Sequence, residues 1–68
     1  MISYQQQIAN LLECALADAR LVESFMRLEY GTLDNLSPQK FKSEAKIGYA
    51  CVQVDPEAAK ELATSYGL

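Results

Sequence analysis

The sequence predicts an all-α fold: a long N-terminal helix in an antiparallel hairpin with a second helix, followed by a short third helix after a proline. Three observations support this prediction. Apolar residues recur with the helical period along the 68 residues. No segment alternates between apolar and polar residues with a period of two. A capping side chain directly before a proline, the usual start of a helix, occurs twice, at Ser37-Pro38 and Asp55-Pro56.

The first helix is expected over residues 4–30. Ser3 can accept a hydrogen bond from the first turn, and neither proline nor glycine follows until Gly31, a residue suited to the left-handed conformation after a last turn. Such a helix is about 40 Å long.

The second and third helices are expected over residues 38–54 and 56–66. Asp55 can cap the third helix, and Gly67 ends it. Their lengths sum to roughly that of the first helix, at about 1.5 Å per residue, so together they can return along it as one broken arm. The sequence thus predicts one small helical domain over residues 1–68.

Helix 38–54 has one expected packing face and a second apolar edge. Ala45 and Gly48 are small and lie at the centre of the packing face, where they would let another helix approach closely. The packing face consists of Phe41, Ala45, Gly48 and Val52. The second edge consists of Ile47, Ala50, Cys51 and Val54.

Helix 4–30 has more apolar circumference than one neighbouring helix can cover. Its polar side, which includes Glu23 and Ser24, is expected to face water, and the remaining arc of about 200° is apolar. We therefore expect a second copy to complete a dimeric helical bundle; the alternative is a monomeric bundle in which the other two helices cover both apolar stripes. The candidate interface residues are Cys14, Asp18, Leu21, Phe25, Leu28 and Tyr49.

Asp18 is a carboxylate among apolar neighbours, and two interpretations apply to it. It can lie at a partly hydrated boundary and pair with a lysine or arginine, or it can be buried at a contact between subunits, where a paired charge determines register. Neither interpretation is catalytic, because no second acid, base or metal ligand accompanies it.

Composition argues against an enzyme and against a metal or cofactor site. The chain has no histidine, and its cysteines, Cys14 and Cys51, lack the spacing of a metal or redox motif, so structural thiols in a reduced protein are expected. No apolar run is long enough to span a membrane and no secretory signal is recognisable, so the predicted location is cytoplasmic.

The predicted function is a noncatalytic protein-interaction or regulatory module, a homodimer that can also bind another protein. A small nucleic-acid-binding regulator is the alternative, based on Lys40, Lys42 and Lys46. The net charge of −3 disfavours that alternative because nucleic-acid phosphates are also negative.

Overall fold

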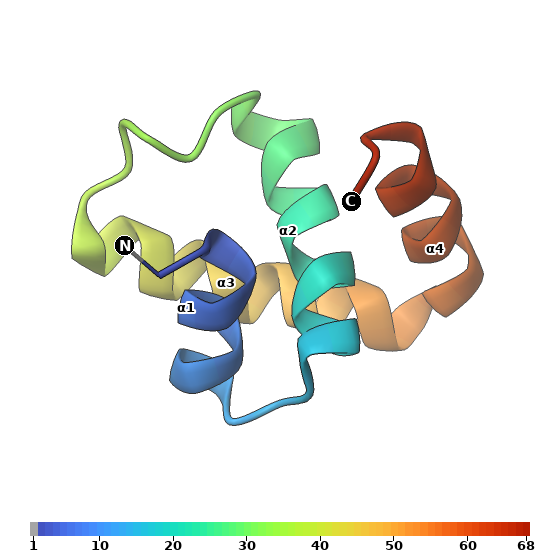
Figure 1. Ribbon diagram of the computed structural model, residues 1–68, viewed down its shortest axis with the longest axis horizontal. Helices are drawn as coiled ribbons and strands as arrows, with labels where there is room; N and C mark the ends of the chain where they lie inside the picture. Colours follow the sequence, from blue (N-terminus) through green and yellow to red (C-terminus); the bar gives the residue numbers. More distant parts are fainter. Residues whose placement is uncertain (1) are drawn as a thin grey trace.

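Four helices form the described part of the protein. A computed structural model describes residues 2–68, and within this range the elements are α1 (Tyr4–Leu12), α2 (Leu16–Tyr30), α3 (Pro38–Val54) and α4 (Pro56–Ser65), with no strand. Figure 1 shows α2 at the centre, α1 and α4 on opposite sides of it, and α3 passing across the back. Since α2 contacts each of the other three helices, it organises the core. The predicted all-α class is confirmed.

The prediction of one continuous helix over residues 4–30 is wrong. The chain leaves the helix at Glu13, whose φ and ψ of 55° and 44° are left-handed, and enters α2 after Ala15, which is extended. The amide of Cys14 donates to the carbonyl of Ala9 at 3.2 Å, the long bond of a Schellman motif. The sequence has no glycine at this position that would predict the break. A left-handed conformation at Glu13 costs about 1–2 kcal/mol.

Burial of α1 against the rest of the chain compensates for the strained residue. Because of the break, α1 packs beside α2 instead of continuing its axis, and Ile8 is completely buried. The longest extent of the Cα trace is 28 Å, which is shorter than the 40 Å rod predicted from an unbroken helix. The hairpin of one long helix with a returning arm is therefore replaced by a compact arrangement around α2.

The other helix ends follow the local signals in the sequence. Ser3, Ser37 and Asp55 cap α1, α3 and α4 by accepting backbone amides at 3.1, 3.2 and 3.1 Å, respectively. Gly31, with φ of 73°, ends α2 as expected. The bounds of α3 coincide with the expected range, and α4 ends one residue earlier than expected.

The predicted packing face of α3 lies in the core. Phe41, Ala45 and Val52 are buried, as is Gly48. A Cβ atom on Gly48 would lie 3.1 Å from Cγ1 of Val22 in α2, so the close helix approach expected at this glycine is confirmed.

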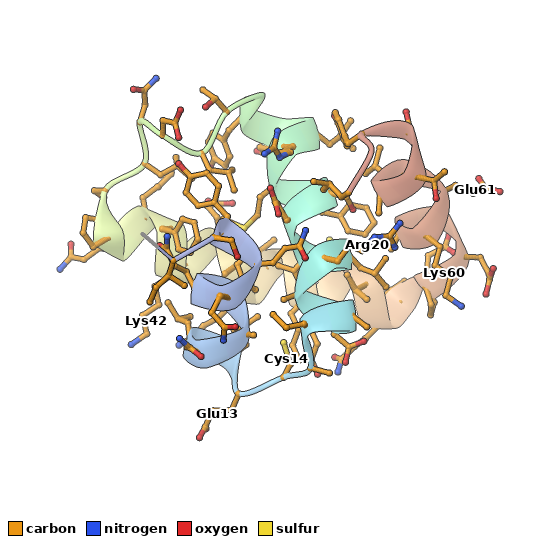
Figure 2. The ribbon with its side chains drawn as sticks, viewed as in Figure 1. Glu13, Cys14, Arg20, Lys42, Lys60 and Glu61 are labelled. Carbon is orange, nitrogen blue, oxygen red and sulfur yellow. The ribbon has the colours of Figure 1, made fainter. Side chains whose placement is uncertain are left out.

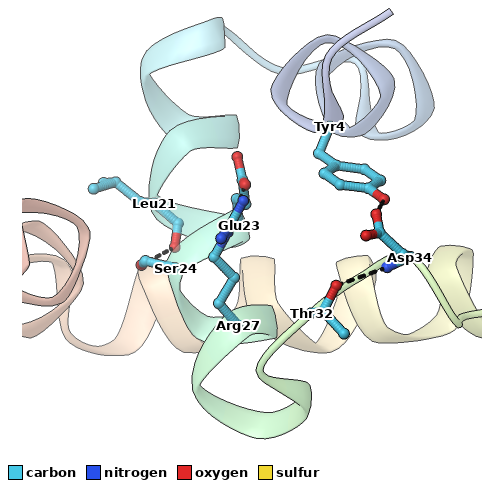
Figure 3. A network of polar contacts seen from close by, with 7 residues as sticks. All are labelled: Tyr4, Leu21, Glu23, Ser24, Arg27, Thr32 and Asp34. Carbon is cyan, nitrogen blue, oxygen red and sulfur yellow. Dashed lines mark hydrogen bonds and ion pairs between the residues drawn. The ribbon is translucent and has the colours of Figure 1, made fainter. Parts of the chain in front are cut away.

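Two polar residues that were expected to face water are buried instead. The side chain of Ser24 is fully buried and donates to the carbonyl of Leu21 at 2.6 Å. Glu23 is only 3% exposed, and its carboxylate accepts a hydrogen bond from Arg27 Nε at 2.8 Å (Figure 3). α2 packs against the other three helices, so it has no wide polar face. The side chains of Glu23 and Ser24 therefore form their hydrogen bonds within α2 itself.

The chain itself covers most of one predicted apolar stripe of the N-terminal helix, while the other stripe stays partly open at Leu28, which is 61% exposed. Val22 and Met26 from one apolar stripe, and Leu21 from the other, are buried by the chain itself. Large apolar side chains do remain exposed, but the most exposed of them, Val54, belongs to α3.

Candidate functional site

An open apolar surface lies on the outer side of α3, where α3, α2 and α4 meet. It is a shallow groove of about 490 Å³. We call it the outer face. Its lining residues are Phe25 from α2, Ile47, Ala50, Cys51 and Val54 from α3, the junction residue Asp55, and Ala58 from α4.

Helical geometry explains why these side chains are exposed. The packing face of α3 points toward Val22, and Ile47, Ala50 and Val54 are spaced so that they project from the other side of the same helix. Ile47 is 57% exposed and Val54 is 85% exposed. Single exposed aliphatic residues are common on monomers, but a contiguous apolar groove is typical of an interaction surface.

Charged residues lie beside the outer face. Asp55 lines its α4 end and is held there because its carboxylate caps α4 through the amide of Ala58. Lys46 is exposed and precedes Ile47 on the polar side of α3. Figure 2 shows Lys42 near the start of α3 and Glu61 on α4 at the opposite end of the molecule.

Of the six candidate interface residues, Phe25 alone lines the outer face. Leu21 is buried in the core, Tyr49 is half-buried and packs against the core, and Leu28 is exposed on α2 but does not line the groove. Most of the lining comes from the second apolar edge that the sequence predicts for α3, namely Ile47, Ala50, Cys51 and Val54. The prediction of one unbroken helix over residues 4–30 overestimates the width of the apolar stripes that remain uncovered on this segment.

Cys14 and Asp18 lie where the N-terminal helix is broken. Figure 2 shows Glu13 pointing away from the molecule and Cys14 turned toward it. Burial raises the pKa of the Cys14 thiol, and the negative charge of Asp18 raises it further. Asp18 is partly exposed in the first turn of α2, where a carboxylate interacts favourably with the helix dipole, and no ion pair within residues 2–68 involves it. This position accounts for a carboxylate among apolar neighbours.

A second hollow, of about 300 Å³, lies between α1, the residue 31–37 connection and the start of α3. At its edge the hydroxyl of Tyr4 donates to the carboxylate of Asp34, and the amide of Asp34 donates to Thr32 Oγ1 at 3.3 Å (Figure 3). The hydrogen bond to Asp34 raises the pKa of Tyr4, with desolvation as the second cause. The contact joins α1 to the connection, and no nucleophile or base accompanies it among the lining residues.

The Tyr4 contact makes stability depend on pH in the alkaline range. A raised pKa means that folding favours the protonated hydroxyl, so its stabilisation is complete below the ordinary pKa of 10.0 and is lost as the pH rises through the folded-state value. We expect Tyr4→Phe to lower the thermal midpoint near pH 7, and this difference from the original protein to shrink above about pH 10. Thermal unfolding of both proteins followed by circular dichroism measures it; a constant difference across the pH range contradicts it.

The lysines of α3 do not form one basic surface. Lys40 lies 3.8 Å from Glu44 and 5.9 Å from the centre of the Tyr30 ring. Lys42 and Lys46 are exposed, one helical turn apart, and form no ion pair within the described residues. Of the three lysines on which the sequence bases a nucleic-acid-binding surface, only Lys42 and Lys46 therefore share a side of α3.

Metal-ligating groups are not gathered in residues 2–68: no three side chains of histidine, cysteine, aspartate or glutamate are placed to hold an ion. Cys14 and Cys51 are both free thiols. Within the same range, no helix is both long and apolar enough to cross a membrane.

Comparison of the chain with protein-family models, with curated proteins and with solved structures finds no match.

Proposed function

We propose that the protein is a noncatalytic helical interaction module that forms a homodimer through the outer face. The observation that carries this proposal is the apolar groove whose lining includes Ile47, 57% exposed, and Val54, 85% exposed. Full burial of one such side chain contributes about 1.5–3 kcal/mol. A surface of this kind is therefore a source of binding energy.

The size of the chain favours association. A single domain of about 60–70 residues buries only about 60% of the surface that its unfolded chain exposes, less than a larger domain does, and is marginally stable alone. A standard interface covers about 800 Å² on each partner, roughly a fifth of the 4314 Å² that this chain exposes. The groove is smaller than such an interface requires on its own, so we expect a dimer that forms at micromolar or higher concentrations.

A second copy is the partner that the charges favour. The outer face has Lys46 on one side and Asp55 at its end, so it offers both signs of charge to an identical surface. A strongly acidic or strongly basic partner would find only one of these complementary. Pairing with a copy also buries the same apolar groove twice.

A nucleic-acid-binding regulator remains the second candidate. Its support is the pair of exposed lysines Lys42 and Lys46 on one side of α3, neither of which forms an ion pair within residues 2–68. With a net charge of −3, the chain repels phosphates elsewhere on its surface. It has weaker support than self-association because the apolar groove plays no part in it.

The homodimer is tested by solution mass measured over a range of concentrations, from about 5 µM to about 500 µM. We expect the mass to rise from monomer to dimer. Val54→Glu should weaken the dimer at least about tenfold, because it removes a buried methyl pair and places a charge in the interface. Gln53→Glu introduces the same residue at the neighbouring position on the polar side of α3 and should leave association unchanged.

The matched pair separates an interface effect from an effect on folding. Both variants should keep the circular dichroism spectrum and thermal midpoint of the original protein measured under monomeric conditions. A mass that stays monomeric throughout the range overturns the homodimer. Binding of mixed-sequence RNA or DNA at low salt by the original protein, lost in a Lys42→Glu and Lys46→Glu double variant, would instead support the nucleic-acid candidate.

A further inference from the structure

We infer that the surface on which α1 packs is also a binding site for α1 of a second copy, so that two chains can exchange their N-terminal helices. In the exchanged dimer, residues 4–30 of each chain form one continuous helix, and α1 packs on α2 and α3 of the other chain. This exchange does not involve the outer face. Three features carry it: the direction of α1, the conformation of the 13–15 connection and the burial of Ile8.

The direction of α1 allows a copy of the helix to take its place. α1 runs antiparallel to α2, because only residues 13–15 join its end to the start of α2, while Tyr4 at its first turn donates to Asp34 beyond the far end of α2 (Figures 1 and 3). If the connection straightens, α1 continues the axis of α2 and leaves its site. Two such extended helices that lie side by side in opposite directions place α1 of each chain against α2 of the other.

The 13–15 connection lacks the residues that usually keep a helix broken. Glu13 is left-handed, with φ of 55°, a conformation that glycine adopts freely and glutamate does not. Ala15, at the N-cap of α2, supplies no side-chain hydrogen bond to the first turn. A continuous helix removes the left-handed residue and gives the first amides of α2 carbonyl partners. The local sequence therefore favours the straight form, and short strained hinges promote exchange of this kind.

The apolar contacts of α1 need a partner surface in either form. Ile8 and Ala9 are buried, and a helix of nine residues is not stable alone. An opened monomer leaves these residues and the surface beneath them in water. An exchanged dimer covers both again with the same contacts, because the two chains have the same sequence. The balance between closed monomer and exchanged dimer therefore depends on concentration.

Proline at position 16 tests the exchange. Leu16 is the first residue of α2, where proline fits, and Ala15 before it has φ of −69° and ψ of 153°, the extended conformation that precedes proline. The closed monomer therefore accepts Leu16→Pro, but a continuous helix over residues 4–30 does not, since proline would lie in its interior. The test is made in a Val54→Glu background, which weakens association through the outer face. After unfolding in denaturant and refolding at about 500 µM, solution mass should show dimer, and added Leu16→Pro should abolish it.

Leu16→Ala in the same background is the matched control. It truncates the same side chain, which is 51% exposed, without interrupting a helix, so the dimer should remain. Both variants should keep the circular dichroism spectrum of the monomer. Glu13→Gly should raise the dissociation constant of the exchanged dimer at least about thirtyfold, because glycine relieves the closed hinge and both hinges of the dimer lose that advantage.

Cross-linking between two different chains identifies the helix that moves. One chain has Tyr4→Cys and the other Asp34→Cys, and Cys14→Ser and Cys51→Ser remove the native thiols from both. Residues 4 and 34 are in contact within one closed chain, and exchange places residue 4 of one chain beside residue 34 of the other. A short bismaleimide, which adds one thiol across each maleimide double bond, should join the two chains when they are refolded together. Chains refolded separately and then mixed should give no such product.

The outcomes separate the exchange from the proposed homodimer. Val54→Glu protein that stays monomeric after refolding at about 500 µM overturns the exchange and leaves the homodimer through the outer face intact. Equal amounts of dimer in the Leu16→Pro and Leu16→Ala variants also overturn the exchange, as does the absence of the 4–34 product. Dimer that survives Val54→Glu and is lost with Leu16→Pro supports the exchange, whether or not the outer face associates.

Discussion

Replacing Gly48 with valine is expected to destabilise the fold by about 1–3 kcal/mol, the usual cost of forcing a larger side chain into a packed core. The first added atom would already lie 3.1 Å from Val22 Cγ1 and 3.4 Å from the Val22 carbonyl oxygen. Val22 is fully buried and has little freedom to move away. The gain in helix propensity over glycine is only a few tenths of a kcal/mol, too small to offset the overlap.

The expected loss for the Gly48 variant is large compared with the total stability of the domain. A chain of this length is expected to have a free energy of unfolding of about 3–10 kcal/mol. Urea denaturation followed by circular dichroism measures the change. Gln53→Val is the control, since it adds the same β-branched residue to an exposed position of α3. Equal midpoints for the two variants would show that α2 and α3 do not approach as closely as described.

Replacing Ile8 with alanine is expected to cost about 2–5 kcal/mol, the largest effect of any single aliphatic truncation considered. Ile8 is completely buried and is one of the two buried residues of α1, together with Ala9. A helix of nine residues is not stable by itself, so α1 depends on this contact. We expect α1 to detach, or the whole domain to unfold.

The control for Ile8→Ala is Ile2→Ala, which removes the same atoms from a side chain that is 53% exposed. We expect it to change the free energy of unfolding by no more than about 0.5 kcal/mol. Hydrogen exchange at the amides of α1 distinguishes local detachment from global unfolding. Similar losses for both variants would contradict the placement of α1 in the core.

Helix ends with a local chemical signal were predictable from the sequence. Ser3, Ser37 and Asp55 each cap a helix in the structure, and Gly31 ends α2 with a positive φ. These features depend on hydrogen bonds between residues two to four apart, so a short segment contains all the information. The packing face of α3 was predictable for a related reason, since the helical period alone defines which residues share a side.

The break at Glu13 was not predictable in the same way. Residues 4–30 contain no proline or glycine, and a left-handed glutamate is locally unfavourable. The conformation persists because it lets α1 turn and bury Ile8 against the rest of the chain. Glu23 and Ser24 of α2 are also buried in the folded chain. The open apolar groove therefore lies mainly on α3 rather than on the N-terminal helix.

The amino-acid sequence by itself therefore determined the helical class, the caps and which residues of α3 share a side of the helix, because these follow from interactions within a few residues. The tertiary structure decided that the first helix is broken, that α2 packs against all three other helices and that Ile47 and Val54 remain uncovered. Burial of apolar surface between segments distant in sequence outweighed a local backbone cost, and no local pattern contains that balance.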